Sequence, residues 1–147
     1  MNWTARGLLS LSLLLAGIGA LGQQIKVVVR DEKNGRGLRD AVVWVQFYEA
    51  PANRALQRIQ YKTGSDGIVR FALPAPPPVH LTVSASARPY YEGFVNAATV
   101  DIIRNGAVNR RDLKASGPQA TACPGEVIFL LPRISWWIRL LAPLEKG

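Results

Sequence analysis

Hydrophobic and polar residues alternate along short stretches from Gln23 onward, and turn-forming residues interrupt the pattern about every ten residues. A period of two is typical of strands that bury one face. The clearest such segments cover residues 25–30, 41–48, 58–63, 68–73 and 79–83, with a weaker one at 94–103. No helical pattern is long enough to supply crossover helices between parallel strands. The pattern therefore predicts an all-β protein.

The alternation also predicts which side chains form the core. The predicted inward positions are Ile25, Val27, Val29, Ala41, Val43, Val45, Phe47, Ile59, Tyr61, Thr63, Val69, Phe71, Leu73, Val79, Leu81 and Val83. The near-continuous apolar run at 126–131 differs, because it is typical of a strand buried on both faces. Six or seven strands at this spacing indicate a sandwich of two sheets.

The predicted connections have different compositions. Residues 64–67 contain an Asp-Gly pair, which favours a tight turn. Residues 74–78 include four prolines and predict a stiff connector that cannot join a strand ladder. Residues 104–122 are polar, basic and rich in turn formers, so we expect a long mobile loop there.

The first 22 residues have the composition of a secretory signal peptide. Arg6 is their only charge, an apolar run follows at 8–15, and the small residues Ala20 and Gly22 precede Gln23. The apolar run is short for a bilayer span, although a retained N-terminal anchor is the alternative. We expect export, so that the protein is periplasmic, envelope-associated or secreted. The predicted organisation is a signal peptide at 1–22, a β-sandwich at 23–133 and an amphipathic tail at 134–147.

The tail is rich in tryptophan and is expected to form a short helix. A helix would place Trp137, Leu140, Leu141 and Leu144 near one stripe, with Arg139 elsewhere. Trp136 and Trp137 beside Arg139 suit a membrane interface. The same stripe is also compatible with docking on the sandwich or on a partner. Trp136, Trp137 and Arg139 are therefore the candidate docking residues.

Composition excludes several kinds of site. The chain has 147 residues, 18 Lys and Arg against 10 Asp and Glu, one Cys and one His, and a formal charge of +8. One Cys cannot form an intrachain disulfide, and one Cys with one His cannot complete a four-ligand zinc site. We expect Cys123 to be buried or inert. The basic residues are scattered, and export separates the protein from nucleic acid, so no nucleic-acid partner is expected.

Three segments resemble carboxypeptidase regulatory-like domains. Residues 37–45 read GLRDAVVWV, residues 63–74 read TGSDGIVRFALP, and residues 79–85 read VHLTVSA. They are similar to that family's opening strand, its Asp-Gly hairpin and a following strand, although Leu38 stands one place early. The resemblance implies a seven-stranded immunoglobulin-like or prealbumin-like sandwich, grouped by fold with starch-binding-like domains. Such modules occur beside peptidase domains, on surface proteins and in outer-membrane receptors.

No catalytic or metal-binding constellation is visible in the sequence. His80 is the only histidine, so a metallocarboxypeptidase zinc site is excluded, and the alternation turns His80 outward. Asp31, Glu32 and Asp66 lack the ligand spacing of a calcium loop, which favours ordinary turn chemistry. We therefore expect no catalytic residue, no metal and no cofactor.

Trp44 and Tyr48 are the best candidates for a ligand-binding face. Both are predicted to face outward, and Arg70 is the third candidate; Arg58, Gln60 and Lys62 also line predicted outer faces. Aromatic rings beside hydrogen-bonding groups can stack on sugars. The alternative is that residues 104–122 or the C-terminus cover both rings. The sequence therefore predicts a non-enzymatic exported binding module with a protein or glycan partner. The alternative is a carbohydrate-binding or regulatory accessory to a separate hydrolase.

Overall fold

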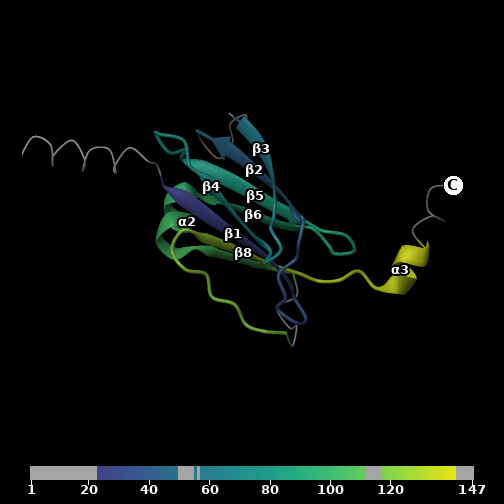
Figure 1. The fold of residues 1–147 in the computed structure, drawn as a ribbon. Helices are drawn as coiled ribbons and strands as arrows, with labels where there is room; N and C mark the ends of the chain where they lie inside the picture. Colours follow the sequence, from purple (N-terminus) through teal and green to yellow (C-terminus); the bar gives the residue numbers. More distant parts are fainter. Residues whose placement is uncertain (1–22, 50–54, 56, 112–116, 142–147) are drawn as a thin grey trace, which may run out of the picture.

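The structure, a computed structural model, describes residues 23–49, 55, 57–111 and 117–141, which form two four-stranded sheets (Figure 1). One sheet, the β1 sheet, has the order β4 (Ile68–Ala72), β1 (Gln24–Asp31), β8 (Glu126–Leu131), β7 (Ala107–Arg110). The other, the β2 sheet, has the order β3 (Gln57–Lys62), β2 (Val42–Tyr48), β5 (His80–Ser86), β6 (Gly93–Ala98). The described residues also form the helices α2 (Thr99–Asn105) and α3 (Trp136–Leu141). The predicted signal peptide at 1–22 lies outside the described residues.

The two sheets share one hydrophobic core, as the alternation predicted. Ile25, Val27 and Val29 of the β1 sheet are fully buried in the same cluster as Val43 and Val45 of the β2 sheet. The other predicted inward positions belong to this cluster or pack against it, with two exceptions. Thr63 is buried, and its hydroxyl donates to the Leu38 carbonyl at 2.5 Å. Val79 is 62% exposed, so its predicted inward position is wrong; β5 begins one residue later, at the end of the proline connector.

The apolar run at 126–131 forms a central strand, β8, which is buried on both faces as predicted. It lies parallel to both β1 and β7. Val127, Phe129 and Leu131 enter the shared core. Ile128 and Leu130 point the other way and form a second cluster with Val28.

The prediction of seven strands is wrong, since the described residues contain eight. The expected long loop at 104–122 contains the end of α2 and all of β7. The weak segment at 94–103 is a strand only as far as Ala98 and then turns into α2. A sequence as short and polar as Ala107–Arg110 carries little strand signal by itself, and its pairing with β8 supplies the ladder.

The turn at 64–67 is correctly predicted, but the hairpin implied by the resemblance is wrong. The Gly67 amide donates to the Gly64 carbonyl at 3.0 Å, and Gly67 has a φ of 77°. However, β3 pairs with β2, whereas β4 pairs with β1, so the turn passes the chain from one sheet to the other. A Cβ atom on Gly37 would lie 2.0 Å from the Asp66 carbonyl oxygen. The turn therefore packs directly against the backbone of the loop after β1.

The tail begins with a fixed attachment and ends in a projecting helix. The Ile134 amide donates to the Pro89 carbonyl at 2.8 Å, which ties the start of the tail to the loop before β6. Beyond this point α3 stands away from the sheets (Figure 1). No residue of α3 is buried. Neither helix of the described residues has the length and apolar composition that a membrane span requires.

Candidate functional site

The outer face of the β2 sheet brings aromatic and hydrogen-bonding side chains together from all four strands. We call this surface the open face. Its cross-strand rows are Gln60–Trp44–Ser84–Phe94, Arg58–Gln46–Thr82–Asn96 and Tyr48–His80. Phe94 is 55% exposed, while Trp44 and Tyr48 are half-buried. Solvent therefore reaches both large aromatic residues of the first row.

A hollow of about 180 Å³ lies between the two aromatic side chains of the first row. Trp44 on β2 and Phe94 on β6 stand on either side of the small Ser84 on β5. Because β5 lies between β2 and β6, these two strands are two strand spacings apart, or about 9–10 Å. Arg58 borders the hollow on the β3 side and Glu92 on the β6 side. The result is a slot with aromatic walls, a low polar floor and one charge of each sign.

Contacts within the open face hold several of its polar groups in place. The guanidinium carbon of Arg58 lies 4.1 Å from the centre of the Trp44 ring, at cation–π distance. The Tyr48 hydroxyl donates to the Gln46 side-chain carbonyl at 2.8 Å. The His80 ring lies edge-on to Tyr48, with 6.5 Å between ring centres, and it is hydrogen bonded to Asn96. These contacts limit the rearrangement that a ligand would require.

Of the three predicted ligand-face residues, the structure brings together two. Trp44 and Tyr48 lie on the open face, as the alternation predicted. Arg70, the third candidate, lies on β4 in the other sheet and does not share a face with Trp44 and Tyr48. The reason is the turn at 64–67, which carries the chain across to the β1 sheet before Arg70.

Sequence reasoning missed Phe94, Ser84 and Glu92 as lining residues. Ser84 is small and polar and carries no chemical signal of its own. Phe94 begins the weakest of the predicted strands. Only the register of β5 with β6, which sets Ser84 opposite Phe94, completes the slot.

The alternative that residues 104–122 or the C-terminus cover Trp44 fails for the described parts of both segments. Residues 117–123, which we call the strap, run past β1 and β8 on the face of the β1 sheet that is turned away from the β2 sheet (Figure 1). Ala120 and Ala122 of the strap pack against the Val28 cluster, on the outer face of the β1 sheet. At the C-terminus, α3 has no buried residue.

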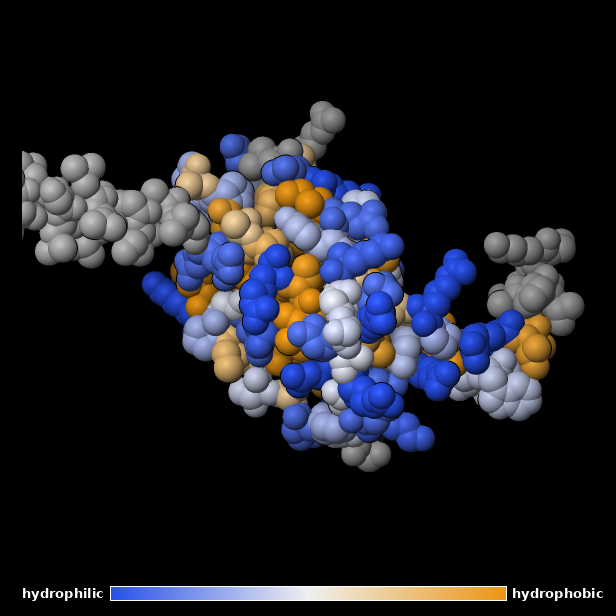
Figure 2. All heavy atoms as spheres, viewed as in Figure 1, coloured by the Kyte–Doolittle hydropathy of each residue, from blue (hydrophilic) through white to orange (hydrophobic). Residues whose placement is uncertain are grey.

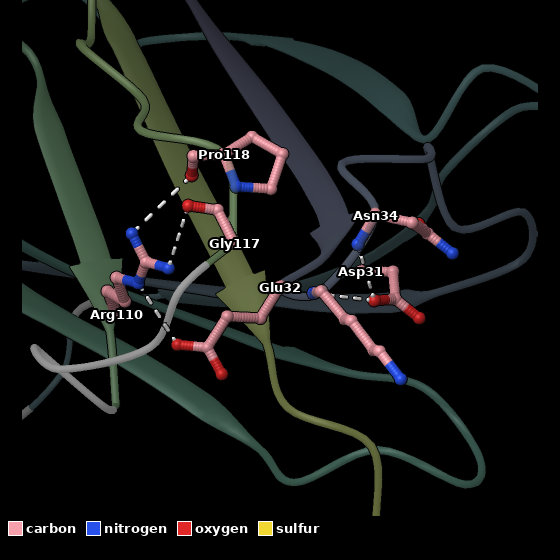
Figure 3. Close-up of polar contacts among 7 residues, drawn as sticks. Asp31, Glu32, Asn34, Arg110, Gly117 and Pro118 are labelled. Atoms are coloured by element: carbon pink, nitrogen blue, oxygen red, sulfur yellow. Dashed lines mark hydrogen bonds and ion pairs between the residues drawn. The ribbon is translucent and has the colours of Figure 1, made fainter.

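A buried ion pair holds the strap in place (Figure 3). The Arg110 Nε atom lies 3.2 Å from a Glu32 carboxylate oxygen, and both side chains are less than one-tenth exposed. The other Arg110 nitrogens donate to the carbonyls of Gly117 and Pro118, each at 3.4 Å. Glu32 is therefore a structural anion.

The other two acidic candidates serve the backbone, as the turn interpretation predicted. Asp31 accepts hydrogen bonds from the amides of Lys33 and Asn34 and from the Tyr90 hydroxyl at 2.8 Å. Asp66 accepts from the Ile68 amide at 3.0 Å. In the described part of the chain, no group of three or more His, Cys, Asp or Glu residues could hold a metal ion.

The pKa of Asp31 reflects opposing influences. Burial raises the pKa, because a carboxylate loses hydration there. The hydrogen bonds from Tyr90 and from the two backbone amides, together with the charge of Arg133, lower it further than burial raises it. The net result is a pKa below the ordinary value of 3.8. Asp31 is therefore held in its ionised form.

Cys123 is exposed, so the expectation that it is buried is wrong, while the alternative expectation that its thiol is inert stays a prediction. It precedes the turn into β8, where the Cys123 carbonyl accepts a hydrogen bond from the Glu126 amide at 3.0 Å. The residue serves the turn through its backbone, which leaves the thiol outside the packed region.

The predicted docking residues Trp136, Trp137 and Arg139 all lie on α3, close to the C-terminus. Trp136 is 68% exposed and Trp137 is 53% exposed. Trp136 and Arg139 border a second hollow, of about 840 Å³, which the loop after β1 borders on its other side through Lys33 and Asn34. The tail is thus exposed beyond its attachment and carries positive charge at its base.

No model of a known protein family matches this chain, and no curated protein matches it.

Proposed function

We propose that this protein is a non-enzymatic binding module and that the open face is its ligand surface. The observation that carries the proposal is the slot in which Trp44 and Phe94 face each other across Ser84. Large aromatic residues that stay accessible on a folded domain mark interaction sites more often than isolated apolar residues do. The hydrogen-bonding groups beside them supply direction.

The ligand that fits this chemistry best is a saccharide. A pyranose ring has apolar C–H faces that stack on aromatic rings, and its hydroxyls both donate and accept hydrogen bonds. Trp44 and Phe94 offer the rings, while Ser84, Gln46 and Thr82 offer neutral polar groups. A regulatory accessory to a separate hydrolase would use the same surface. A protein partner is the other candidate.

We also propose that the protein is exported and that it belongs to the carboxypeptidase regulatory-like group. Export is supported by the charge, apolar run and small residues of 1–22. Membership in the carboxypeptidase regulatory-like group is supported by the residue patterns at 37–45 and 79–85 and by a fold of two packed sheets. The pattern at 63–74 does not add support, because its turn joins two sheets and closes no hairpin. The module would then act in the envelope or outside the cell.

A glycan array spanning neutral and acidic saccharides tests the ligand class. The wild-type chain from Gln23 should bind a limited set of saccharides saturably. Trp44→Ala should lower that binding at least tenfold, because a stacked aromatic side chain contributes about 1.5–3 kcal/mol. Tyr48→Ala should lower it less, since Tyr48 lies beside the slot and does not line it.

Arg70→Ala is the matched control, because it removes an exposed side chain from the other sheet. It should leave saccharide binding unchanged. If the wild type binds no saccharide, the ligand class is wrong. If Trp44→Ala lowers both binding and melting temperature, Trp44 has a packing role, and the result no longer supports the open face as the ligand surface.

A further inference from the structure

The second hollow and α3 combine apolar and cationic side chains at one end of the molecule. The most exposed large hydrophobic residues of the described chain include Trp136 at 68%, Leu140 at 65% and Trp137 at 53%. Figure 2 shows α3 clear of the body, with hydrophobic and hydrophilic residues side by side on it. A domain does not ordinarily leave such a group uncovered. We therefore expect this exposed apolar group to be covered by a binding partner outside the described residues.

Positive charge gathers at the base of the same helix. Lys33, Arg133 and Arg139 all line the second hollow. Its acidic lining residue, Asp31, already accepts hydrogen bonds from the Tyr90 hydroxyl and from the amides of Lys33 and Asn34. The hollow therefore offers a net positive charge to a ligand, and an anion matches it.

The base of α3 is fixed to the sandwich, which gives the surface a defined shape. Arg133 forms a β-bridge with Tyr90, and the Ile134 amide donates to the Pro89 carbonyl at 2.8 Å. The Tyr91 amide donates to the Pro132 carbonyl at 3.0 Å. The cations at the base and the apolar side chains of α3 are thus presented together.

We propose that α3 and the second hollow form a docking surface for an anionic phospholipid membrane. Trp136, Trp137 and Leu140 enter the interfacial layer, while Lys33, Arg133 and Arg139 meet lipid phosphates. Tryptophan prefers the interface between headgroups and acyl chains, and basic residues near the surface strengthen attachment to anionic lipid. This surface is separate from the open face, so the inference goes beyond the proposed function.

A second copy of the chain fits this surface less well than a membrane does. A helix of six residues is only about 9 Å long, so it offers a small contact surface. A stable protein interface buries about 800 Å² on each partner, which is more than such a helix can supply by itself. Two copies would also bring the same cationic hollows together. The net charge of +8 opposes that approach and favours an anionic surface.

Vesicle flotation of the chain from Gln23 tests the proposal, since this chain contains every described strand of both sheets. Vesicles of phosphatidylcholine with phosphatidylglycerol should carry the protein upward at low salt. Phosphatidylcholine alone should carry much less. The double variant Trp136→Ser/Trp137→Ser should reduce partitioning to anionic vesicles at least tenfold, because each indole would lose its place in the interface.

Charge and position are tested by two further variants. Arg133→Gln/Arg139→Gln should weaken partitioning about fivefold for each charge removed, with no effect on phosphatidylcholine vesicles. Phe94→Ser removes an exposed aromatic residue from the open face and should float like the wild type. All three variants should keep the wild-type circular dichroism spectrum, because the substituted side chains are exposed.

Either of two results would overturn the proposal: a wild type that fails to float with anionic vesicles at low salt, or a Trp136→Ser/Trp137→Ser variant that floats equally well. If the wild type does not float and sedimentation without lipid shows a dimer that depends on Trp136 and Trp137, a second copy is the occupant. None of these results bears on saccharide binding, so the two proposals fail independently.

Discussion

The two outer faces of the sandwich are built differently. The outer face of the β1 sheet carries Val28, Ile128 and Leu130, each at most 3% exposed, beneath the strap. The outer face of the β2 sheet carries Trp44, Ser84 and Phe94, which solvent reaches. The difference follows from sequence, since β8 is apolar on both sides while β2 alternates. The strap therefore covers an apolar surface, whereas no described segment covers the open face, which remains accessible to a ligand.

Breaking the ion pair that holds the strap should have the largest effect. Arg110→Met leaves Glu32 as a buried anion without its guanidinium, and we expect a loss of about 3–5 kcal/mol of unfolding free energy. Urea titration followed by circular dichroism measures it. Arg39→Met is the control, because its pair with Asp40 is more than two-thirds exposed on both sides and should contribute little. Equal losses in the two variants would contradict the structural role of Arg110.

Creating a cavity beneath the strap should cost slightly less. Ile128→Ala removes a side chain that is 3% exposed, and we expect a loss of about 2–4 kcal/mol. Phe94→Ala on the open face should cost less than about 1 kcal/mol, because Phe94 is already 55% exposed. The same urea titrations compare them. Similar costs would mean that the two faces are equally packed and would remove the contrast between them.

The Tyr90–Asp31 hydrogen bond should give a pH-dependent effect of intermediate size. Because the folded pKa of Asp31 lies below its ordinary 3.8, its stabilising contribution is present above about pH 4 and is lost as the pH falls through the folded value. Tyr90→Phe should therefore cost about 1–2 kcal/mol at pH 7 and less at strongly acidic pH.

Unfolding free energies at pH 7 and below pH 3 measure that difference. Asp31→Asn provides the control, because an amide has no carboxyl proton to gain in this range. In the Asp31→Asn background, Tyr90→Phe should lose its pH dependence. A constant penalty for Tyr90→Phe at every pH in the wild-type background would show that packing of the ring, and not the charge of Asp31, determines its cost.

The smallest effect on stability is expected on the open face itself. Trp44→Ala and Tyr48→Ala should each lower the unfolding free energy by about 1 kcal/mol or less, because both side chains are only half-buried. Differential scanning calorimetry measures this. A loss comparable to that of Ile128→Ala would identify Trp44 as part of the packed structure and would place the open face in the same class as the covered one.

The sequence predicts the core and most strands because burial imposes a visible period. Val43, Val45 and Phe47 alternate with Trp44 and Gln46, and this pattern needs no partner strand to be recognised. Strand β7 and the assignment of Arg70 to a sheet escape such reasoning. Both depend on which strands pair, and the turn at 64–67 looks the same in sequence whether it closes a hairpin or crosses between sheets.

The candidate site was predictable to a similar extent. Trp44 and Tyr48 follow from alternation within one strand, whereas Phe94 becomes their neighbour only through the register of β6 with β5 and of β5 with β2. The exposure of Trp136 and Trp137 could not be derived from the helical stripe. A stripe predicts that a surface will be covered, but it does not identify what covers it.

The most direct measurement is an NMR titration of the chain from Gln23 with the saccharide that the array retains best. Amide shifts should concentrate on β2, β5 and β6, around Trp44, Ser84 and Phe94. Amides of β1 and β8 beneath the strap should not move. Shifts that concentrate on the β1 sheet, or that leave the residues around Trp44 unchanged, would contradict the claim that the open face binds the ligand.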